Sequence, residues 1–530
     1  MTPFVKIAKG STFMHKFSKP IAILAMAALT TGCEDLLVED PESFITSDTY
    51  YTTEAEIDAA AVAMYSLFQD WNMFKVQYQW TFELAADQGR FHPDEPNVET
   101  QAPEFLNWTS TSRDAVQPWK TLYWNILRAH QVLDNLDNIE FSDSALRARL
   151  EAEGKFMRAF HYFWLVRAYG DVPLYLSEDE QIQVDRPRTP EADVLAQIIA
   201  DATDAAAGLP ERWPNDGLGR ATRGAANMLL ADVYRWRANV HTQSTADWQA
   251  ASDAAQAVIN SGVYMLEADY AKIHTPGAGL RSEEIFSVQS IGGGGFFQSS
   301  LYGGVYWPRS LAEGNGGGWA VVIPTPEFHG SYIDGDYRKD ATFWTEGCPA
   351  SEPVDCASPT AFTPVDFGTF TGGYPHVRKY IPTDRGKNFW GGGDTNIPLY
   401  RYAEAYLIYA EAQNELGNGA EAAAAVNMIR ARARGGASGT ENRAEPANIA
   451  VLGTTEMKDA IYQERSWELS FELKRWFDLV QRGESYFLSQ FATWDPFANN
   501  LGNVVASRMR LPIPAEEIQK NPALTQNPGY

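Results

Sequence analysis

The stretch AYLIYAEAQNELGNGAEAAAAVNMIRARA, residues 405–433, contains two segments of helical periodicity joined by a short turn. In the first segment small and large apolar residues alternate from turn to turn, and the second segment is rich in alanine. The stretch ANMLLADVYRWRANVHTQSTADWQAASDAAQAVINSG, residues 226–262, repeats this layout. Apolar residues at helical spacing form one face of an amphipathic helix. Each stretch therefore predicts a pair of helices joined by a turn.

This layout resembles the tetratricopeptide pattern, in which small residues let neighbouring helices approach closely. The same periodicity continues through much of the chain. It predicts helices over residues 54–70, 117–136, 144–169, 190–207, 221–238, 246–260, 398–416, 418–434 and 455–482. The sequence therefore predicts a mainly α fold with helical hairpin repeats.

The composition changes between residues 265 and 398, where glycine, proline and aromatic residues crowd together. Such a segment predicts loops, with short strands at 284–289 and 319–323. It is too rich in aromatic residues for a disordered linker, so we expect an ordered insertion packed on the helices. The last residues, 505–530, include four prolines, and we expect an extended tail along the body.

The beginning of the chain has the pattern of an export signal. A basic stretch, KFSK at 16–19, precedes the nine-residue apolar run at 21–29. Spanning a bilayer takes about 20 residues, whereas a run of this length fits the hydrophobic part of a secretory signal. The following TTGC resembles the lipobox of bacterial lipoproteins. We predict that residues 1–32 are a signal peptide and that Cys33 is lipidated, the alternative being a cleaved signal with an incidental cysteine.

The remaining cysteines and the overall charge limit the classes of function. The chain has 68 acidic and 43 basic residues, a net charge of -25, which disfavours binding of nucleic acid. Cys348 and Cys356 are close together in a loop rich in proline and serine, and in an exported protein they predict a small disulfide loop. No histidine or second cysteine pair has zinc-ligand spacing near them, so we expect no metal site.

Seven blocks, in order along nearly the whole mature chain, resemble the SusD/RagB family of Bacteroidota outer-membrane nutrient-binding lipoproteins. The blocks are residues 33–68, 152–175, 335–343, 396–418, 425–433, 464–483 and 511–530. The first block begins with CEDLL, which also resembles the acidic surface-export tag of such lipoproteins. The resemblance implies an outer-membrane protein that is lipid-anchored and faces outward.

The resemblance also implies an organisation and a partner. Residues 33–262 would form an N-terminal SusD-like helical region. The helical body as a whole would contain about four tetratricopeptide-like units. Residues 263–530 would form the RagB/SusD region, with loops at 265–398, helices at 398–482 and the tail at 505–530. Family members act as a lid on a SusC-like TonB-dependent transporter and capture oligosaccharide, or peptide in RagB-like members. The resemblance implies neither catalysis nor a cofactor.

Charged residues within two of these blocks have a structural interpretation. Arg158 and Arg167 are expected to pair with acids or to cap carbonyl groups between helices. Charged residues three or four apart predict a salt-bridged helix face; they are Glu464, Arg465, Glu468, Glu472 and Arg475. A catalytic carboxylate pair could be drawn here, so a cell-surface glycoside hydrolase is an alternative, although no common catalytic motif is found in the sequence.

Aromatic residues in loops are the candidates for ligand binding, because the C–H faces of sugar rings stack on them. The ligand-binding candidates are Phe91, Trp108, Tyr302, Trp307, Trp319 and Trp390, with His92, Phe296, Phe297 and Tyr306 nearby in the same loops. Packing against the helical body is the alternative for each of them. We therefore predict a glycan-binding lipoprotein, with a peptide binder, a hydrolase and a purely structural scaffold as alternatives.

Overall fold

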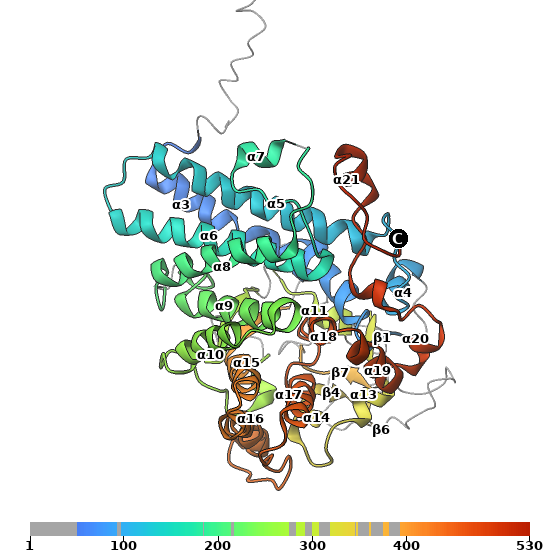
Figure 1. Ribbon diagram of the computed structural model, residues 1–530. Coiled ribbons are helices and arrows are strands. Elements are labelled where there is room, and N and C mark those ends of the chain that lie inside the picture. Colours follow the sequence, from blue (N-terminus) through green and yellow to red (C-terminus); the bar gives the residue numbers. More distant parts are fainter. Residues whose placement is uncertain are drawn as a thin grey trace, which may run out of the picture. The chain divides into compact units, whose positions relative to one another are not determined.

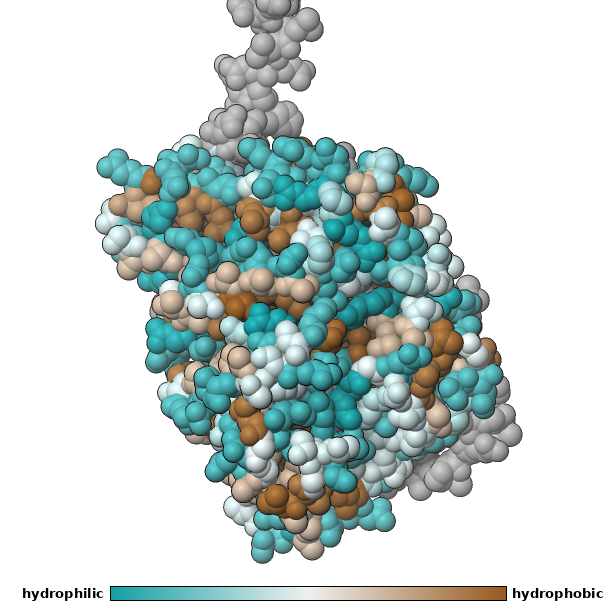
Figure 2. Space-filling view, in the orientation of Figure 1, coloured by the Kyte–Doolittle hydropathy of each residue, from teal (hydrophilic) through white to brown (hydrophobic). Residues whose placement is uncertain are grey.

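Helices make up most of the computed structural model. It describes residues 50–92, 97–183, 185–213, 217–274, 282–291, 299–306, 319–344, 346–347, 360–361, 375–380 and 393–530. Residues 52–530 form one unit, to which the following description applies. None of the helices in these ranges has the length and apolar character needed to cross a membrane. Figure 2 shows hydrophobic residues in separate patches on one face, set among hydrophilic ones.

The first half of the unit is a succession of helices, each packed on the next (Figure 1). The long helices are α3 (Glu54–Ala63), α5 (Arg113–Asn135), α6 (Ser144–Tyr169), α8 (Glu191–Gly208), α9 (Arg223–Arg237) and α10 (Thr245–Ile259). The short ones are η1 (Ser66–Gln69), η2 (Trp71–Lys75), η3 (Gln79–Glu83), α4 (Val98–Glu104), η4 (Leu136–Asn138), α7 (Glu178–Ile182), η6 (Ala238–Thr242) and η7 (Tyr270–Lys272). Helix α5 packs on α6, α6 on α8, α8 on α9 and α9 on α10.

The two stretches that predicted hairpins lie side by side in space. Helix α10 of the first packs on α15 (Tyr402–Glu415), which continues into α16 (Gly419–Arg434) of the second. Their shared core combines one large ring with small residues: Trp248 packs with Ala238, Ala251 and Ala412. The chain thus resumes the helical stack after an insertion of more than a hundred residues. The prediction of a mainly α fold is confirmed, and the number of repeat units stays a prediction.

The second half contributes shorter elements around this stack (Figure 1). Its further helices are α11 (Tyr302–Tyr306), α13 (Pro326–Gly330), α14 (Tyr337–Thr342), η9 (Gly436–Ser438), α17 (Thr454–Glu468), α18 (Arg475–Gln481), α19 (Glu484–Trp494), α20 (Pro496–Asn500), η10 (Ala506–Met509) and α21 (Ala515–Lys520). Helix α17 packs on both α15 and α16, which extends the stack by one helix.

The strands form antiparallel pairs, each of two strands. The pairs are β1 (Gly89–Phe91) with β3 (Val322–Pro324), β2 (Glu284–Val288) with β8 (Ile397–Arg401), β4 (Phe343–Trp344) with β7 (His376–Val377), and β5 (Glu346–Gly347) with β6 (Thr360–Ala361). Strand β2 confirms the strand predicted at 284–289, and β3 confirms the second with a start three residues later. The β1–β3 pair brings residue 89 next to residue 324, so the two halves of the chain meet there.

Two predicted helix boundaries are wrong. The helix expected from residue 398 begins at Tyr402, because residues 397–401 pair with β2 as a strand that includes Pro398, which lacks a backbone N–H. The helix expected over 455–482 is interrupted after Glu468. Phe471 and Leu473 in the interruption adopt left-handed backbone conformations, with φ of 58° and 60°, which a continuous α-helix cannot contain.

Two more expectations need a smaller correction. Helix α3 ends at Ala63, and only a 3₁₀ turn follows before Asp70, so the predicted helix 54–70 is too long. The tail is not extended throughout, since η10 and α21 lie within it. The predicted arginine pairings are confirmed: Arg158 makes two 2.8 Å hydrogen bonds to Asp201, and Arg167 lies 3.2 Å from Asp232.

Candidate ligand-binding site

Three tryptophans from distant parts of the chain meet at the surface. The ring centroid of Trp71 lies 5.9 Å from that of Trp80 and 5.5 Å from that of Trp319. Trp80 and Trp319 are 6.3 Å apart, and the three rings are inclined to one another by 56–84°. All three side chains are partly exposed. We refer to Trp71, Trp80 and Trp319 as the tryptophan cluster.

Two π-helical turns place the first two rings. Asp70 begins η2 by accepting a 2.8 Å hydrogen bond from the N–H of Asn72. Within η2, Met73 leaves the helical region (φ -125°, ψ -132°), and η3 follows with a second π-helical turn. Such turns change the direction of side chains and are frequent at functional sites. Trp71 and Trp80 consequently remain partly exposed, whereas the apolar residues between them are buried.

Trp319 reaches the cluster from the other half of the chain. The residues after Trp319 lead into β3. Strand β3 pairs with β1, which follows η3 by a few residues in the sequence. The N–H of Val321 donates a 2.8 Å hydrogen bond to the carbonyl of Val305 in α11, and Ala320 adopts a left-handed φ of 49°. The position of Trp319 therefore depends on two elements that are more than two hundred residues apart in sequence.

Polar side chains border the tryptophan cluster. The guanidinium of Arg113, at the start of α5, lies 6.0 Å from the Trp80 ring centroid and donates a 3.0 Å hydrogen bond to Oδ1 of Asn72. The site thus combines aromatic faces with a guanidinium and an amide group. This combination suits a ligand that has both C–H faces and hydroxyl groups.

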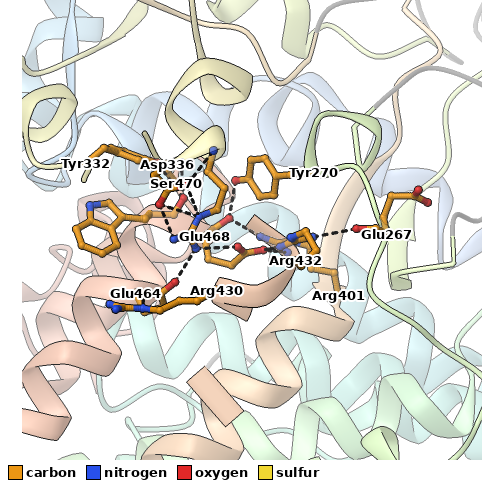
Figure 3. Close-up of polar contacts among 12 residues, drawn as sticks. Glu267, Tyr270, Tyr332, Asp336, Arg401, Arg430, Arg432, Glu464, Glu468 and Ser470 are labelled. Carbon is orange, nitrogen blue, oxygen red and sulfur yellow. Dashed lines mark hydrogen bonds and ion pairs between the residues drawn. The ribbon is translucent and has the colours of Figure 1, made fainter. Parts of the chain in front are cut away.

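Apart from the tryptophan cluster, a network of buried charged side chains surrounds Glu468, at the end of α17 (Figure 3). Its carboxylate lies 2.6 Å from a guanidinium nitrogen of Arg401, 3.1 Å from one of Arg338, and also pairs with Arg432. Burial alone would raise its pKa. The guanidinium groups of Arg432, Arg401 and Arg338 nevertheless hold the pKa of Glu468 well below the ordinary value. A carboxylate kept ionised in this way does not suit general-acid catalysis.

This network corrects the prediction of a salt-bridged helix face. The charged residues do form ion pairs, but they are buried and most partners come from other elements. The partners are Arg338 and Arg430 for Glu464, Asp478 and Glu404 for Arg465, Arg401 and Lys379 for Glu472, and Asp87 for Arg475. In the described ranges, no three His, Cys, Asp or Glu side chains are grouped so that they could hold a metal ion.

Two protein-family models match successive parts of the chain. The model described as "Starch-binding associating with outer membrane" matches residues 37–235, and the model described as "SusD family" matches residues 283–530. The chain belongs to the SusD/RagB family. One relative of this SusD/RagB protein, SusD-like protein P2 of Formosa agariphila, is 29% identical to it, and the match covers 96% of this chain and 99% of that protein.

Solved structures of SusD-like proteins have the same fold. A SusD homologue from Bacteroides thetaiotaomicron superposes with a TM-score of 0.79 at 22% identity, and the match covers 91% of this chain and 98% of that one. A structure described as a laminarin-binding SusD-like protein gives a TM-score of 0.71 at 24% identity, and covers 91% and 100% of the two chains. The fold predicted from the resemblance is therefore shared by solved members of the family.

The structure places the predicted ligand residues of this SusD/RagB protein in different environments. Trp319 belongs to the tryptophan cluster, and His92 is partly exposed. Trp108 is buried against Trp476, at 5.6 Å between ring centroids, and its indole N–H donates to the hydroxyl of Tyr530. Phe91, Tyr302 and Tyr306 are also buried. For these buried residues the geometry favours the packing alternative, and ligand contact stays a prediction.

Several predicted residues lie outside the described ranges; they are Cys33, Phe296, Phe297, Trp307, Cys348, Cys356 and Trp390. Sequence reasoning in turn missed Trp71, Trp80 and Arg113. A local signal for the first two exists, because the helical periodicity ends at Asp70 and two tryptophans follow within ten residues. Their proximity to Trp319 has no local signal, since it arises from the β1–β3 pairing.

Proposed function

We propose that this SusD/RagB protein binds oligosaccharide at the tryptophan cluster and has no catalytic role and no cofactor. The observation that carries the proposal is the partly exposed three-ring surface bordered by Arg113 and Asn72. The name of the matching family model, starch-binding, and a fold neighbour described as laminarin-binding support a glycan as the ligand class. Stacking on the rings would hold the sugar, and the polar border would orient its hydroxyl groups.

Replacing Trp71 by alanine should weaken oligosaccharide binding about 30-fold, which corresponds to the roughly 2 kcal/mol of a central aromatic contact. Isothermal titration with laminarin- and starch-derived oligosaccharides measures this change. Phe497→Ala is the matched control, because Phe497 is an exposed aromatic residue outside the cluster (44% exposed) and should leave affinity unchanged. Equal affinities of the Trp71→Ala variant and the unmodified protein would contradict the proposed site.

The same titrations separate the alternative functions. Binding of peptides but not of glycans would indicate a peptide binder of the RagB type. Release of reducing ends from a bound polysaccharide would indicate a glycoside hydrolase, whereas retardation in affinity gels without cleavage supports a binder. The absence of any ligand would leave the scaffold alternative.

The proposal includes delivery of the ligand to a SusC-like TonB-dependent transporter. A lipid at Cys33 would hold the protein at the outer membrane, facing outward. The basic stretch, apolar run and TTGC sequence at the start of the chain support this anchoring, and the family model named for outer-membrane association supports the location. Co-purification of a large TonB-dependent receptor from detergent-solubilised outer membranes tests the partner, and its absence would count against the handover.

Cys33→Ser should abolish incorporation of labelled fatty acid and move the protein from the membrane to the soluble fraction. The reason is that bacterial lipoproteins carry their lipid through a cysteine thiol, and Cys33 is the only cysteine in the proposed lipobox. Fractionation and labelling of cells that express the variant measure the effect. Unchanged membrane association of the Cys33→Ser protein would show that another feature provides the anchor.

A further inference from the structure

A pocket of about 440 Å³ lies between α5 and the C-terminal tail, apart from the tryptophan cluster. Its walls come from the middle of α5, the segment after α6 and residues 517–524 of the tail. Helix α21 is held beside α5 by the hydrogen bond from the Ala515 N–H to the Ser110 carbonyl, at 2.9 Å (Figure 1). The volume lies in the usual range for ligand pockets, roughly 300–1,000 Å³.

Aromatic rings form the apolar part of this pocket. The ring centroids of Trp119 and Tyr123 are 5.0 Å apart, and those of Tyr123 and Tyr175 are 6.0 Å apart. The hydroxyl of Tyr123 donates a 2.8 Å hydrogen bond to the Pro173 carbonyl, which fixes its ring. Next to these buried rings, Trp124 is 51% exposed. The pocket therefore has a rigid aromatic wall with an accessible indole at its border.

The polar border of the pocket is balanced in charge. Lys120 lies 2.6 Å from Glu516, and Lys520 lies 2.9 Å from Glu517. Burial raises the pKa of Tyr175. The guanidinium of Arg186, 5.4 Å from the ring centroid, opposes this shift, and the carboxylate of Glu517 adds to it, so Glu517 lies within electrostatic reach of the rings. Two paired cations and two paired anions give no net attraction for a charged ligand.

The pocket also offers hydrogen-bonding groups that the protein does not use. Neither the indole N–H of Trp124, which is 51% exposed, nor the hydroxyl of Tyr175 makes a hydrogen bond to another described residue. A wholly apolar ligand would displace water from these two groups and leave them without partners, at a cost in free energy. A neutral ligand with C–H faces and many hydroxyl groups would satisfy both the rings and the border.

We propose that this pocket is a second carbohydrate-binding site, with Trp124 as its exposed stacking ring and Tyr175 and Glu517 as partners for sugar hydroxyl groups. That the ligand is a carbohydrate rests on the proposed function, whereas the existence of the pocket does not. Arg113 of the first site and Trp124 are eleven residues apart on the same helix, about 16 Å along its axis. A polysaccharide long enough to contact both sites gains avidity, and a short oligosaccharide does not.

The test compares long and short glycans on single and double variants. Trp124→Ala should weaken binding of laminarin or soluble starch about tenfold, and leave binding of laminaritriose or maltotriose, which are too short to contact both sites, unchanged at the first site. The variant should keep its fold, since a substitution at an exposed position usually changes stability by no more than about 0.5 kcal/mol. Trp71→Ala should retain weak binding that the double variant Trp71→Ala/Trp124→Ala loses, and Phe497→Ala again serves as the control.

The remaining outcomes separate this inference from the proposed function. If Trp71→Ala alone abolishes all binding, the second site is refuted and the proposed function stands. If Trp124→Ala abolishes binding and Trp71→Ala does not, the second site stands and the tryptophan cluster is not the main site. If a transporter-derived peptide occupies the pocket, or if neither glycan binds at all, the inference is overturned.

Discussion

Replacing Glu468 by glutamine should lower the free energy of unfolding by about 3–5 kcal/mol, the usual effect of removing one member of a buried ion pair. The carboxylate is fully buried and pairs with three guanidinium groups, those of Arg338, Arg401 and Arg432. Glutamine keeps the shape but not the charge, so these cations would remain in the interior without enough negative charge. Urea unfolding of both proteins measures the difference.

An exposed ion pair provides the matched control. Arg223 and Glu211 lie 3.2 Å apart with side chains that are 46% and 58% exposed. Because exposed pairs contribute little, Glu211→Gln should change stability by less than about 1 kcal/mol. If Glu468→Gln costs no more than Glu211→Gln, the buried network does not depend on charge in the way proposed here.

The same network explains why the end of α17 could not be predicted from sequence. The periodicity of residues 455–482 continues through the interruption, so local information favours one helix. The interruption is held by distant groups: Lys379 donates to the Ser470 carbonyl at 2.9 Å, and the Tyr380 hydroxyl donates to the Phe471 carbonyl at 2.7 Å. These contacts satisfy backbone groups that the helix would otherwise satisfy. In contrast, α6 was predicted at its observed bounds, because Gly170 (φ 76°) is a local stop signal.

The candidate site was predictable only in part for a similar reason. Loop composition marks aromatic residues as candidates, but it does not separate Trp319, which is partly exposed, from Trp108, which is buried. Burial depends on what packs against each loop, here Trp476 and the tail residue Tyr530. Trp71 and Trp80 become part of a site only through the β1–β3 pairing, a contact between the two halves of the chain.

A glutamate near this pairing has the opposite electrostatic situation to Glu468. Glu83, in η3, is 1% exposed. One carboxylate oxygen accepts the N–H of Leu473, and the other has no hydrogen-bond partner among the described residues. Burial raises the pKa of Glu83 to about 8; the Leu473 N–H opposes this shift and the negative charge of Glu472 adds to it. The folded protein therefore holds Glu83 protonated at a pH where the unfolded chain ionises it.

Glu83→Gln should consequently stabilise the protein by about 3 kcal/mol at pH 7 and have little effect near pH 4.5. Between the unfolded pKa near 4.5 and the folded value near 8, the folded state binds more protons than the unfolded state. The free energy of unfolding of the unmodified protein therefore falls as the pH rises through this window, and glutamine removes that loss while it can still accept the Leu473 N–H. Unfolding curves at pH 4.5, 6, 7 and 8 for both proteins measure the difference.

Glu472→Gln is the control in the same region, because its expected effect on stability at pH 7 is opposite to that of Glu83→Gln. Arg401 and Lys379 hold the pKa of Glu472 well below its ordinary value against the effect of burial. Its ionised form therefore stabilises the fold above pH 4.5, and this stabilisation is lost as the pH falls. The Glu472 variant should be less stable than the unmodified protein at pH 7, whereas the Glu83 variant should be more stable. If both variants are destabilised equally at pH 7, Glu83 is ionised in the folded protein and the assigned shift of its pKa is wrong.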